Sequence, residues 1–223
     1  MAPYFTQLVH FASSPRLRGV IALWRRSPKS GPQTPLVVVL HGRGADEHDL
    51  LPVVDRLPSK CTYASVRAFV GVDGGGFTWF ENRGVARPIA KSVRASVVTL
   101  RAWLDEAAPR PTRCYVFGFS AGMMMAGALV LDDPRRFAGA ILLSGVLPLD
   151  SGIPADPGRL SAMPVFYGRG VLDDMIPAPL VAQTAAYLRD LSGADLTLRE
   201  YSHGHSISLR EIQDIAAWLS ERS

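Results

Sequence analysis

Apolar residues along this chain follow two alternating patterns. Short runs rich in β-branched residues, such as Pro-Leu-Val-Val-Val-Leu-His at residues 35–41, are typical of strands covered on both faces. Residues 92–107 instead carry apolar side chains every three or four positions, the period of an amphipathic helix. The patterns predict strands at residues 5–11, 20–25, 35–41, 62–68, from 114 to Ser120, 138–143, 163–167 and 196–201, and helices at residues 92–107, 123–131, 180–191 and from 209 onward.

The order of these elements predicts the fold class. Strands that alternate with helices over the whole chain form a mostly parallel central sheet with helices on both faces, an α/β fold. The last predicted helix begins with the capping box Ser208-x-x-Glu211. Internal repeats, low-complexity tracts and domain boundaries are not recognisable in the sequence. We therefore expect a single domain over residues 1–223.

Polar residues directly after strands are the candidates for chemistry, because ligands of parallel sheets bind at the carboxyl ends of the strands. Four segments qualify: residues 41–44 (His-Gly-Arg-Gly), Ser120, residues 168–174 with two adjacent aspartates, and residues 203–205 (His-Gly-His). In chain order they supply a serine, an acid and a histidine. This is the order of the catalytic triad in α/β-hydrolases.

Ser120 lies at the centre of Gly118-x-Ser120-x-Gly122, between a predicted strand and a predicted helix. In a sharp strand-to-helix turn the central residue adopts a strained conformation and presents its hydroxyl at the end of the sheet. Glycines two residues before and after avoid collisions across the turn. The pattern therefore predicts a nucleophile, although a serine in a glycine-rich connection has the same local sequence.

A serine hydroxyl becomes an effective nucleophile only when a neutral imidazole takes its proton and a carboxylate orients that imidazole. His205 is the favoured base because it lies three residues before the helix cap at Ser208, late enough in the loop to reach back over Ser120. His203, the alternative, is interpreted as a residue at the rim or facing solvent. Asp173 and Asp174 are the two candidates for the acid.

The oxyanion of the tetrahedral intermediate needs preorganised donors. We expect the backbone N–H of Ala121, at the start of the helix after the nucleophile, to be one of them. The backbone N–H of Arg43 is expected to be the other, because the flanking glycines let the main chain approach the substrate. His41, at the end of a buried strand, is expected to brace neighbouring loops by hydrogen bonds, and a direct substrate contact is its alternative role.

Several motifs together resemble the carboxylesterase and phospholipase family of α/β-hydrolases, which includes acyl-protein thioesterases and bacterial predicted esterases. They are Leu40-His41-Gly42-x-Gly44, Gly118-Phe119-Ser120-x-Gly122, Asp173-x-x-Ile176-Pro177 and Gly204-His205-Ser206, and they span the chain from about residue 20 to its end. The Ile-Pro spacing favours Asp173 over Asp174. Trp79-Phe80 also resembles an aromatic pair of this family. The chain departs from many members at Ala121, where they have glutamine, and this leaves substrate preference open.

The resemblance implies a compact α/β-hydrolase without a large lid that cleaves small to medium carboxylic esters or thioesters through an acyl-enzyme, without a metal or organic cofactor. A lysophospholipase, a peptidase or an acyltransferase would use the same triad. A catalytically silent protein that binds a ligand or partner is the alternative from another class. The family often dimerises, so a homodimer is also considered. The predicted pocket residues are Trp79, Phe80, Met123, Met175 and Ile176.

Composition narrows the functional classes further. The net charge is +4 and the pI is near 9.3, but the basic residues form no stripe or arm, so we expect no nucleic-acid partner. Apolar runs are too short for a membrane span, and the N-terminus lacks the pattern of a secretory signal, which makes the cytoplasm the expected location. Cys61 and Cys114 are too few for a disulfide scaffold and are expected to be reduced.

Overall fold

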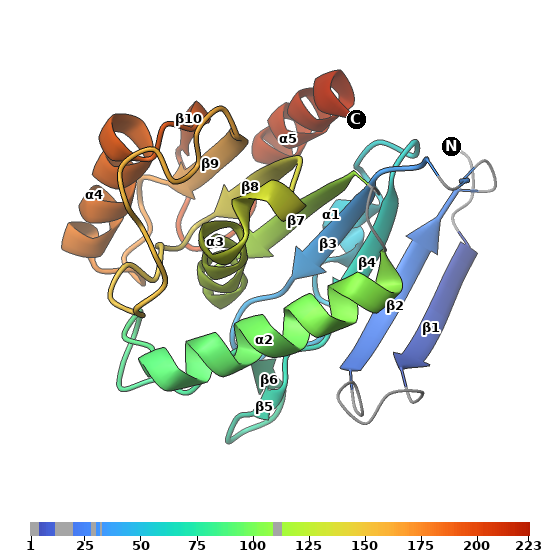
Figure 1. Cartoon of the computed structure of the whole chain (residues 1–223), viewed down its shortest axis with the longest axis horizontal. Helices are drawn as coiled ribbons and strands as arrows, with labels where there is room; N and C mark the ends of the chain where they lie inside the picture. The colour runs from blue at the N-terminus through green and yellow to red at the C-terminus, as the bar shows by residue number, and fades with distance from the viewer. Residues whose placement is uncertain (1–4, 12–19, 28–29, 32, 109–112) are drawn as a thin grey trace.

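The computed structural model describes residues 5–11, 20–27, 30–31, 33–108 and 113–223 (Figure 1). The main sheet has eight strands: β1 (Phe5–Phe11), β2 (Val20–Arg26), β3 (Leu36–Leu40), β4 (Thr62–Val66), β7 (Cys114–Phe119), β8 (Gly139–Leu143), β9 (Pro164–Gly170) and β10 (Asp195–Tyr201). A hairpin of β5 (Val70–Gly71) and β6 (Phe77–Thr78) lies apart from it, and the sequence patterns did not predict this hairpin.

Within the described residues, five α-helices flank the sheet: α1 (Leu51–Val54), α2 (Ala90–Ala107), α3 (Ala121–Asp132), α4 (Ala178–Ala186) and α5 (Leu209–Arg222). The short 3₁₀ turn η1 (Pro134–Arg136) follows α3, and α4 continues into one π-helical turn, η2 (Tyr187–Leu191). The predicted helix over residues 180–191 therefore exists but changes its winding near its end. The helix after Ser120 begins at Ala121, two residues before the predicted start.

The strand order is β1-β2-β4-β3-β7-β8-β9-β10. The β1/β2 and β2/β4 pairs are antiparallel, and every pair from β4 to β10 is parallel. The prediction of a mostly parallel sheet is confirmed. Because β3 and β7 are neighbours in the middle of the sheet, the loops that follow them meet at the same edge.

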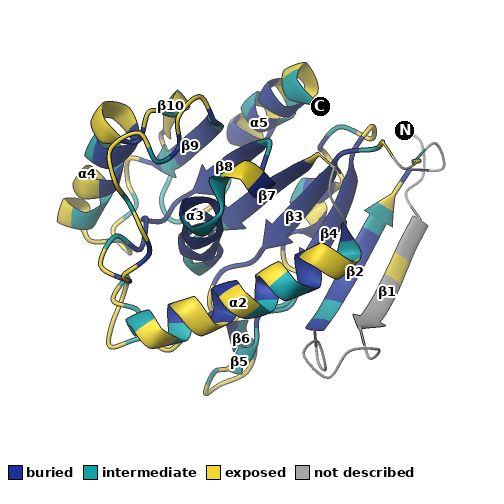
Figure 2. Cartoon of the chain, in the orientation of Figure 1, coloured by how far each residue is buried: buried dark blue, intermediate teal, exposed yellow. Residues whose placement is uncertain are grey.

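Two apolar clusters fill the space between the sheet and its helices. Along β3, Val38 packs with the cluster that includes α2 and α3, whereas Val37 and Val39 pack with the cluster that includes α1 and α5. Successive side chains of a strand point to opposite faces, so an unbroken apolar run is what a strand between two helical layers needs. Figure 2 shows the central strands as the most thoroughly buried part of the described chain.

Helix α5 shows how local sequence sets an element boundary. The Ser208 hydroxyl accepts a hydrogen bond from the Glu211 backbone N–H at 3.2 Å, which confirms the predicted cap. The buried side chains of its apolar face include Ile215 and Trp218, which pack on the sheet. Among the helices of the described ranges, none has the length and apolar character needed to cross a membrane.

Candidate active site

Ser120 occupies the elbow, a tight turn over residues 118–122 between β7 and α3. Its backbone angles, φ 56° and ψ −118°, lie in the left-handed half of conformational space, which non-glycine residues seldom adopt. A Cβ at Gly118 would overlap the Gly122 carbonyl group, so this position requires glycine, as the sequence pattern predicted. A Cβ at Gly122 would instead overlap the Leu40 carbonyl group at the end of β3. Gly122 therefore sets the spacing between the start of α3 and the end of β3, rather than relieving a collision within the turn.

The loop after β3 lies directly against this turn. Leu40 pairs with Gly118 in the sheet register, so residues 42–44 emerge beside Ser120. A Cβ built on Gly42 would lie 3.5 Å from the Ser120 Cβ, and the Gly44 N–H donates to the Phe77 carbonyl oxygen at 2.8 Å. Ala121 is the first residue of α3, so its backbone N–H has no carbonyl partner one turn earlier in the helix.

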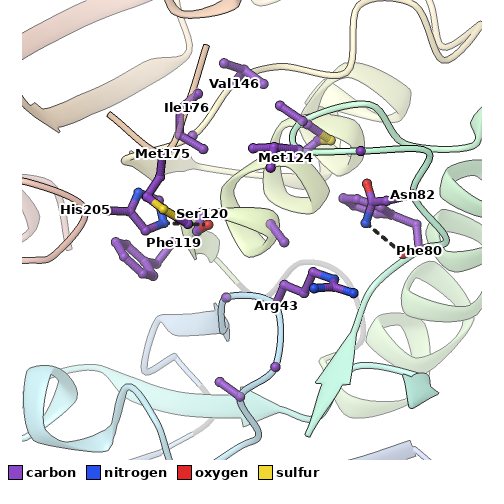
Figure 3. Close-up of a pocket in the computed structure, with 18 of the residues that line it drawn as sticks. Arg43, Phe80, Asn82, Phe119, Ser120, Met124, Val146, Met175, Ile176 and His205 are labelled. Carbon is purple, nitrogen blue, oxygen red and sulfur yellow. Dashed lines mark hydrogen bonds between the residues drawn. The ribbon is translucent and has the colours of Figure 1, made fainter. Parts of the chain in front are cut away.

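The acid and the histidine come from the loops after β9 and β10. His205 Nε2 lies 2.9 Å from Ser120 Oγ, and His205 Nδ1 lies 2.7 Å from Asp173 Oδ2. In the tautomer that satisfies both contacts, Nδ1–H donates to the carboxylate and Nε2 accepts a hydrogen bond from the Ser120 hydroxyl. Figure 3 shows the His205 ring beside Ser120, with Phe119 and Met175 next to it. Asp173 Oδ1 also accepts a hydrogen bond from the Met175 N–H at 3.0 Å.

The two candidate acids, Asp173 and Asp174, have different surroundings in the structure, and so do the two candidate bases, His203 and His205. The Asp173 side chain is only 7% exposed and contacts His205, whereas Asp174 is exposed and provides no side-chain cap for α4. His203 does not face Ser120. Its side chain is 14% exposed and its Nε2 lies 3.2 Å from a Glu211 carboxylate oxygen, so the interpretation of His203 as a rim or solvent-facing residue is wrong.

His41 braces the loops around the site. It is fully buried, its Nε2 accepts a hydrogen bond from the Ala68 N–H at 3.0 Å, and its Nδ1 lies 2.7 Å from the Gly42 carbonyl oxygen. Burial lowers the pKa of His41, which favours the neutral ring that these two contacts require. The backbone carbonyl of His41 also accepts a hydrogen bond from Trp79 Nε1 at 2.8 Å.

A cavity of about 640 Å³ opens over Ser120 and His205 (Figure 3). Its apolar side includes Phe80, Met124, Val146, Met175 and Ile176, and its polar side includes Arg43, Asp49 and Asn82. Burial raises the pKa of Asp49. Pockets of this size commonly hold small organic ligands, and the mixture of walls suits a molecule with one apolar and one polar part.

Two predicted pocket residues lie elsewhere. Trp79 and Met123 are fully buried in the apolar core and do not line the cavity, so these predictions are corrected. Trp79 is turned inward to donate to the His41 carbonyl, and Met123 packs behind Ser120 next to Gly145. Met124, one residue further along α3, contributes to the cavity instead. Phe80, Met175 and Ile176 line it as expected.

The polar groups around the site form ion pairs and hydrogen bonds. Glu47 is buried and accepts two hydrogen bonds from the Arg67 guanidinium. Burial acts to raise the pKa of Glu47, but the Arg67 contact outweighs it and the pKa is lowered. Within the described residues, no group of three or more His, Cys, Asp or Glu side chains is arranged to hold a metal ion.

The described part of the chain forms a mostly parallel eight-stranded sheet with an antiparallel β2. A strained serine follows β7, an acid follows β9 and a histidine follows β10, and together these features define an α/β-hydrolase. The family model described as phospholipase/carboxylesterase matches residues 26–223. The chain therefore belongs to the phospholipase/carboxylesterase family, and its enzyme class is that of the carboxylic ester hydrolases.

Known relatives agree with this assignment. The chain is 26% identical over 197 residues to the putative hydrolase MhqD of Bacillus subtilis, covering 86% of this chain and 96% of the relative. It is 24% identical to acyl-protein thioesterase 1 of Kluyveromyces lactis, covering 88% and 96%. A carboxylesterase structure from Mesorhizobium loti superposes with a TM-score of 0.82 at 25% identity, covering 96% of this chain and 98% of that one.

Proposed function

We propose that this protein is a serine hydrolase that cleaves small to medium carboxylic esters or thioesters through an acyl-enzyme, with Ser120 as nucleophile, His205 as general base and Asp173 as the orienting acid. The observation that carries the proposal is the continuous chain of contacts from Asp173 to His205 to Ser120, at 2.7 and 2.9 Å. The strained elbow supports it independently, because it aims the serine hydroxyl into the cavity.

The reaction follows from this geometry. His205 Nε2 takes the Ser120 proton while Oγ attacks the acyl carbon, and the Asp173 carboxylate stabilises the imidazolium that forms. The backbone N–H groups of Ala121 and Arg43 donate to the oxyanion. When the tetrahedral intermediate collapses, the imidazolium gives its proton to the departing alcohol or thiol. A water molecule, activated by the same imidazole, then attacks the acyl-enzyme and releases the acid.

The cavity supports a substrate of limited size. Its apolar wall, formed by Met124, Val146 and Ile176, suits an acyl chain or an apolar leaving group, and Arg43 with Asn82 marks the polar side. Ala121 leaves the edge of the elbow without the longer polar side chain that many family members carry there. We therefore expect little discrimination between oxygen and sulfur leaving groups.

A fluorophosphonate probe tests the proposal directly. The wild type should gain one probe mass on Ser120, and Ser120→Ala should gain none and lose at least about 10³-fold in esterase activity. p-Nitrophenyl esters of increasing acyl length, assayed beside acyl thioesters, would define the substrate range. Folded wild-type protein that takes up no probe and cleaves no ester would favour the silent alternative. That alternative has a precedent, since one rice relative, 26% identical, is named a probable inactive carboxylesterase.

A further inference from the structure

His203 links the two loops that carry the acid and the base. Its backbone N–H donates to the Tyr201 carbonyl at 2.9 Å, and its backbone carbonyl accepts from the Leu172 N–H at 3.1 Å, one residue before Asp173. Its Nδ1 lies 2.8 Å from the Gly204 carbonyl oxygen, one residue before His205. A displacement of His203 would therefore move both partners of Ser120.

A buried carboxyl group faces the other side of this ring. Glu211, on α5, is fully buried, and one of its oxygens lies 3.2 Å from His203 Nε2. Strand β9 makes room for the pair, because a Cβ at Gly168 would overlap Glu211 and a Cβ at Gly170 would overlap His203. Glu211 is thus the last residue of the capping box Ser208-x-x-Glu211, and its side chain is directed at a histidine.

Few charges act on this carboxyl group. Gly168 brings none from β9, the β10–α5 loop contributes His203 and the Ser208 N–H, and α5 contributes Asp214. From β10, the Tyr201 ring stacks on His203 at 5.8 Å while its hydroxyl donates to Asp214 at 2.9 Å. Burial raises the pKa of Glu211 to about 7, and the nearby His203 opposes that rise. Glu211 therefore changes its charge near neutral pH, unlike an ordinary glutamate.

His203 Nε2 and both Glu211 carboxyl oxygens are buried without a regular hydrogen bond, although Nε2 lies 3.2 Å from one of the oxygens. One proton placed between the ring and the carboxyl group would satisfy this contact. Because Nδ1–H donates to the Gly204 carbonyl, Nε2 must either donate to an ionised Glu211 or accept from a protonated one. Both arrangements hold the same bridging proton. When that proton is lost, a carboxylate faces the lone pair of a neutral Nε2, and the contact becomes repulsive.

We propose that Glu211 and His203 are positioning residues that share one proton and thereby hold the Asp173 and His205 loops in register with Ser120. The inference rests on the proposed function, because it assigns these loops a catalytic task. Loss of the bridging proton loosens both loops, so kcat falls on the alkaline side of the pH profile while KM changes little. Neither residue touches the substrate cavity, and so their effect reaches substrate only through His205 and Asp173.

The test is the pH profile of kcat and KM for a p-nitrophenyl ester, measured for the wild type, Glu211→Gln and the control Glu221→Gln. The wild type and Glu221→Gln, whose side chain is exposed on the same helix, should lose about tenfold in kcat on the alkaline side. A glutamine amide donates to Nε2 at every pH, so Glu211→Gln should lose less than about twofold there. Glu211→Leu, which cannot bridge, should lower kcat at all pH values.

The outcomes separate this inference from the proposed function. If Ser120→Ala keeps full activity, the proposed function is wrong. If Ser120→Ala is inactive while the wild type shows no alkaline fall, or Glu211→Gln shows the wild-type fall, the positioning role is wrong and the proposed function stands. His203→Gln provides a second route should Glu211→Gln not fold. The glutamine amide can donate to an ionised Glu211 or accept from a protonated one, so the alkaline fall should be lost as well, and a retained fall would overturn the inference.

Discussion

Replacement of Gly122 by alanine tests the geometry that brings the elbow and the Arg43 loop together. The added methyl group would lie 2.5 Å from the Leu40 carbonyl carbon and 2.6 Å from the His41 carbonyl oxygen. Non-bonded heavy atoms of this kind prefer about 3.5 Å, so the start of α3 and the end of β3 must separate by about 1 Å. The two proposed oxyanion donors, Ala121 and Arg43, lie on opposite sides of this gap.

The expected costs follow from that displacement. Overpacking in a rigid core costs about 1–3 kcal/mol, which for a chain of this size lowers Tm by roughly 2–12 °C. A 1 Å error in the catalytic arrangement can cost about 10²-fold in rate. Because the separation acts on the oxyanion donors, we expect Gly122→Ala to lose activity mainly in kcat.

Thermal unfolding and esterase assays measure both effects, with Gly71→Ala as the matched control. Gly71 has open space around its Cβ position and no left-handed backbone, so its alanine variant should keep Tm and activity or gain slightly in stability. Gly122→Ala with the wild-type Tm and the wild-type kcat would refute the reasoning, because it would mean that the start of α3 and the end of β3 can separate without consequence.

Two other predictions concern stability and thiol chemistry. Arg67→Met leaves buried Glu47 without its partner and should cost about 3 kcal/mol, near the lower limit for buried pairs because Arg67 is partly exposed. Since the pKa of Glu47 is lowered by folding, the wild type should lose this stabilisation as pH falls below the ordinary value of 4.5, whereas Arg67→Met should show a shallower acid dependence of Tm. Burial raises the pKa of Cys114 to about 12, and Cys61 is also buried, so a thiol reagent at pH 8 should label neither until denaturant is added, and rapid labelling of the folded protein would contradict this.

The strand arrangement and the elbow were predictable because their signals are local. A strand between two helical layers must be apolar on both faces, and the run at residues 35–41 shows this without any tertiary information. Gly118 and Ser120 likewise report a constraint confined to one turn. The order of strand ends then placed Asp173 and His205 at the same edge of the sheet.

The helical phase of α3 was not predictable. Every residue from Gly122 to Leu131 is buried, so the helix has no polar face from which to read its orientation. Met123 and Met124 are therefore equivalent in the sequence, although one packs in the core and the other lines the cavity. Trp79 was wrongly predicted to line the pocket for a related reason. Its inward direction depends on a carbonyl acceptor 38 residues away in the chain.

The contact between His203 and Glu211 shows a third limit of structure prediction from the sequence. The sequence marks Glu211 as a capping residue, and the cap at Ser208 does form. Nothing in the spacing shows that the carboxyl group turns toward the preceding loop, because the space that it occupies is created by two glycines of β9, a strand that precedes it by about 40 residues. The sequence pattern places Gly168 and Gly170 in the segment after the strand predicted at residues 163–167, where their role is not apparent. Only their tertiary position shows that they make room for Glu211 and His203 beside the loop that carries His205, because a Cβ at either glycine would overlap one of these two residues.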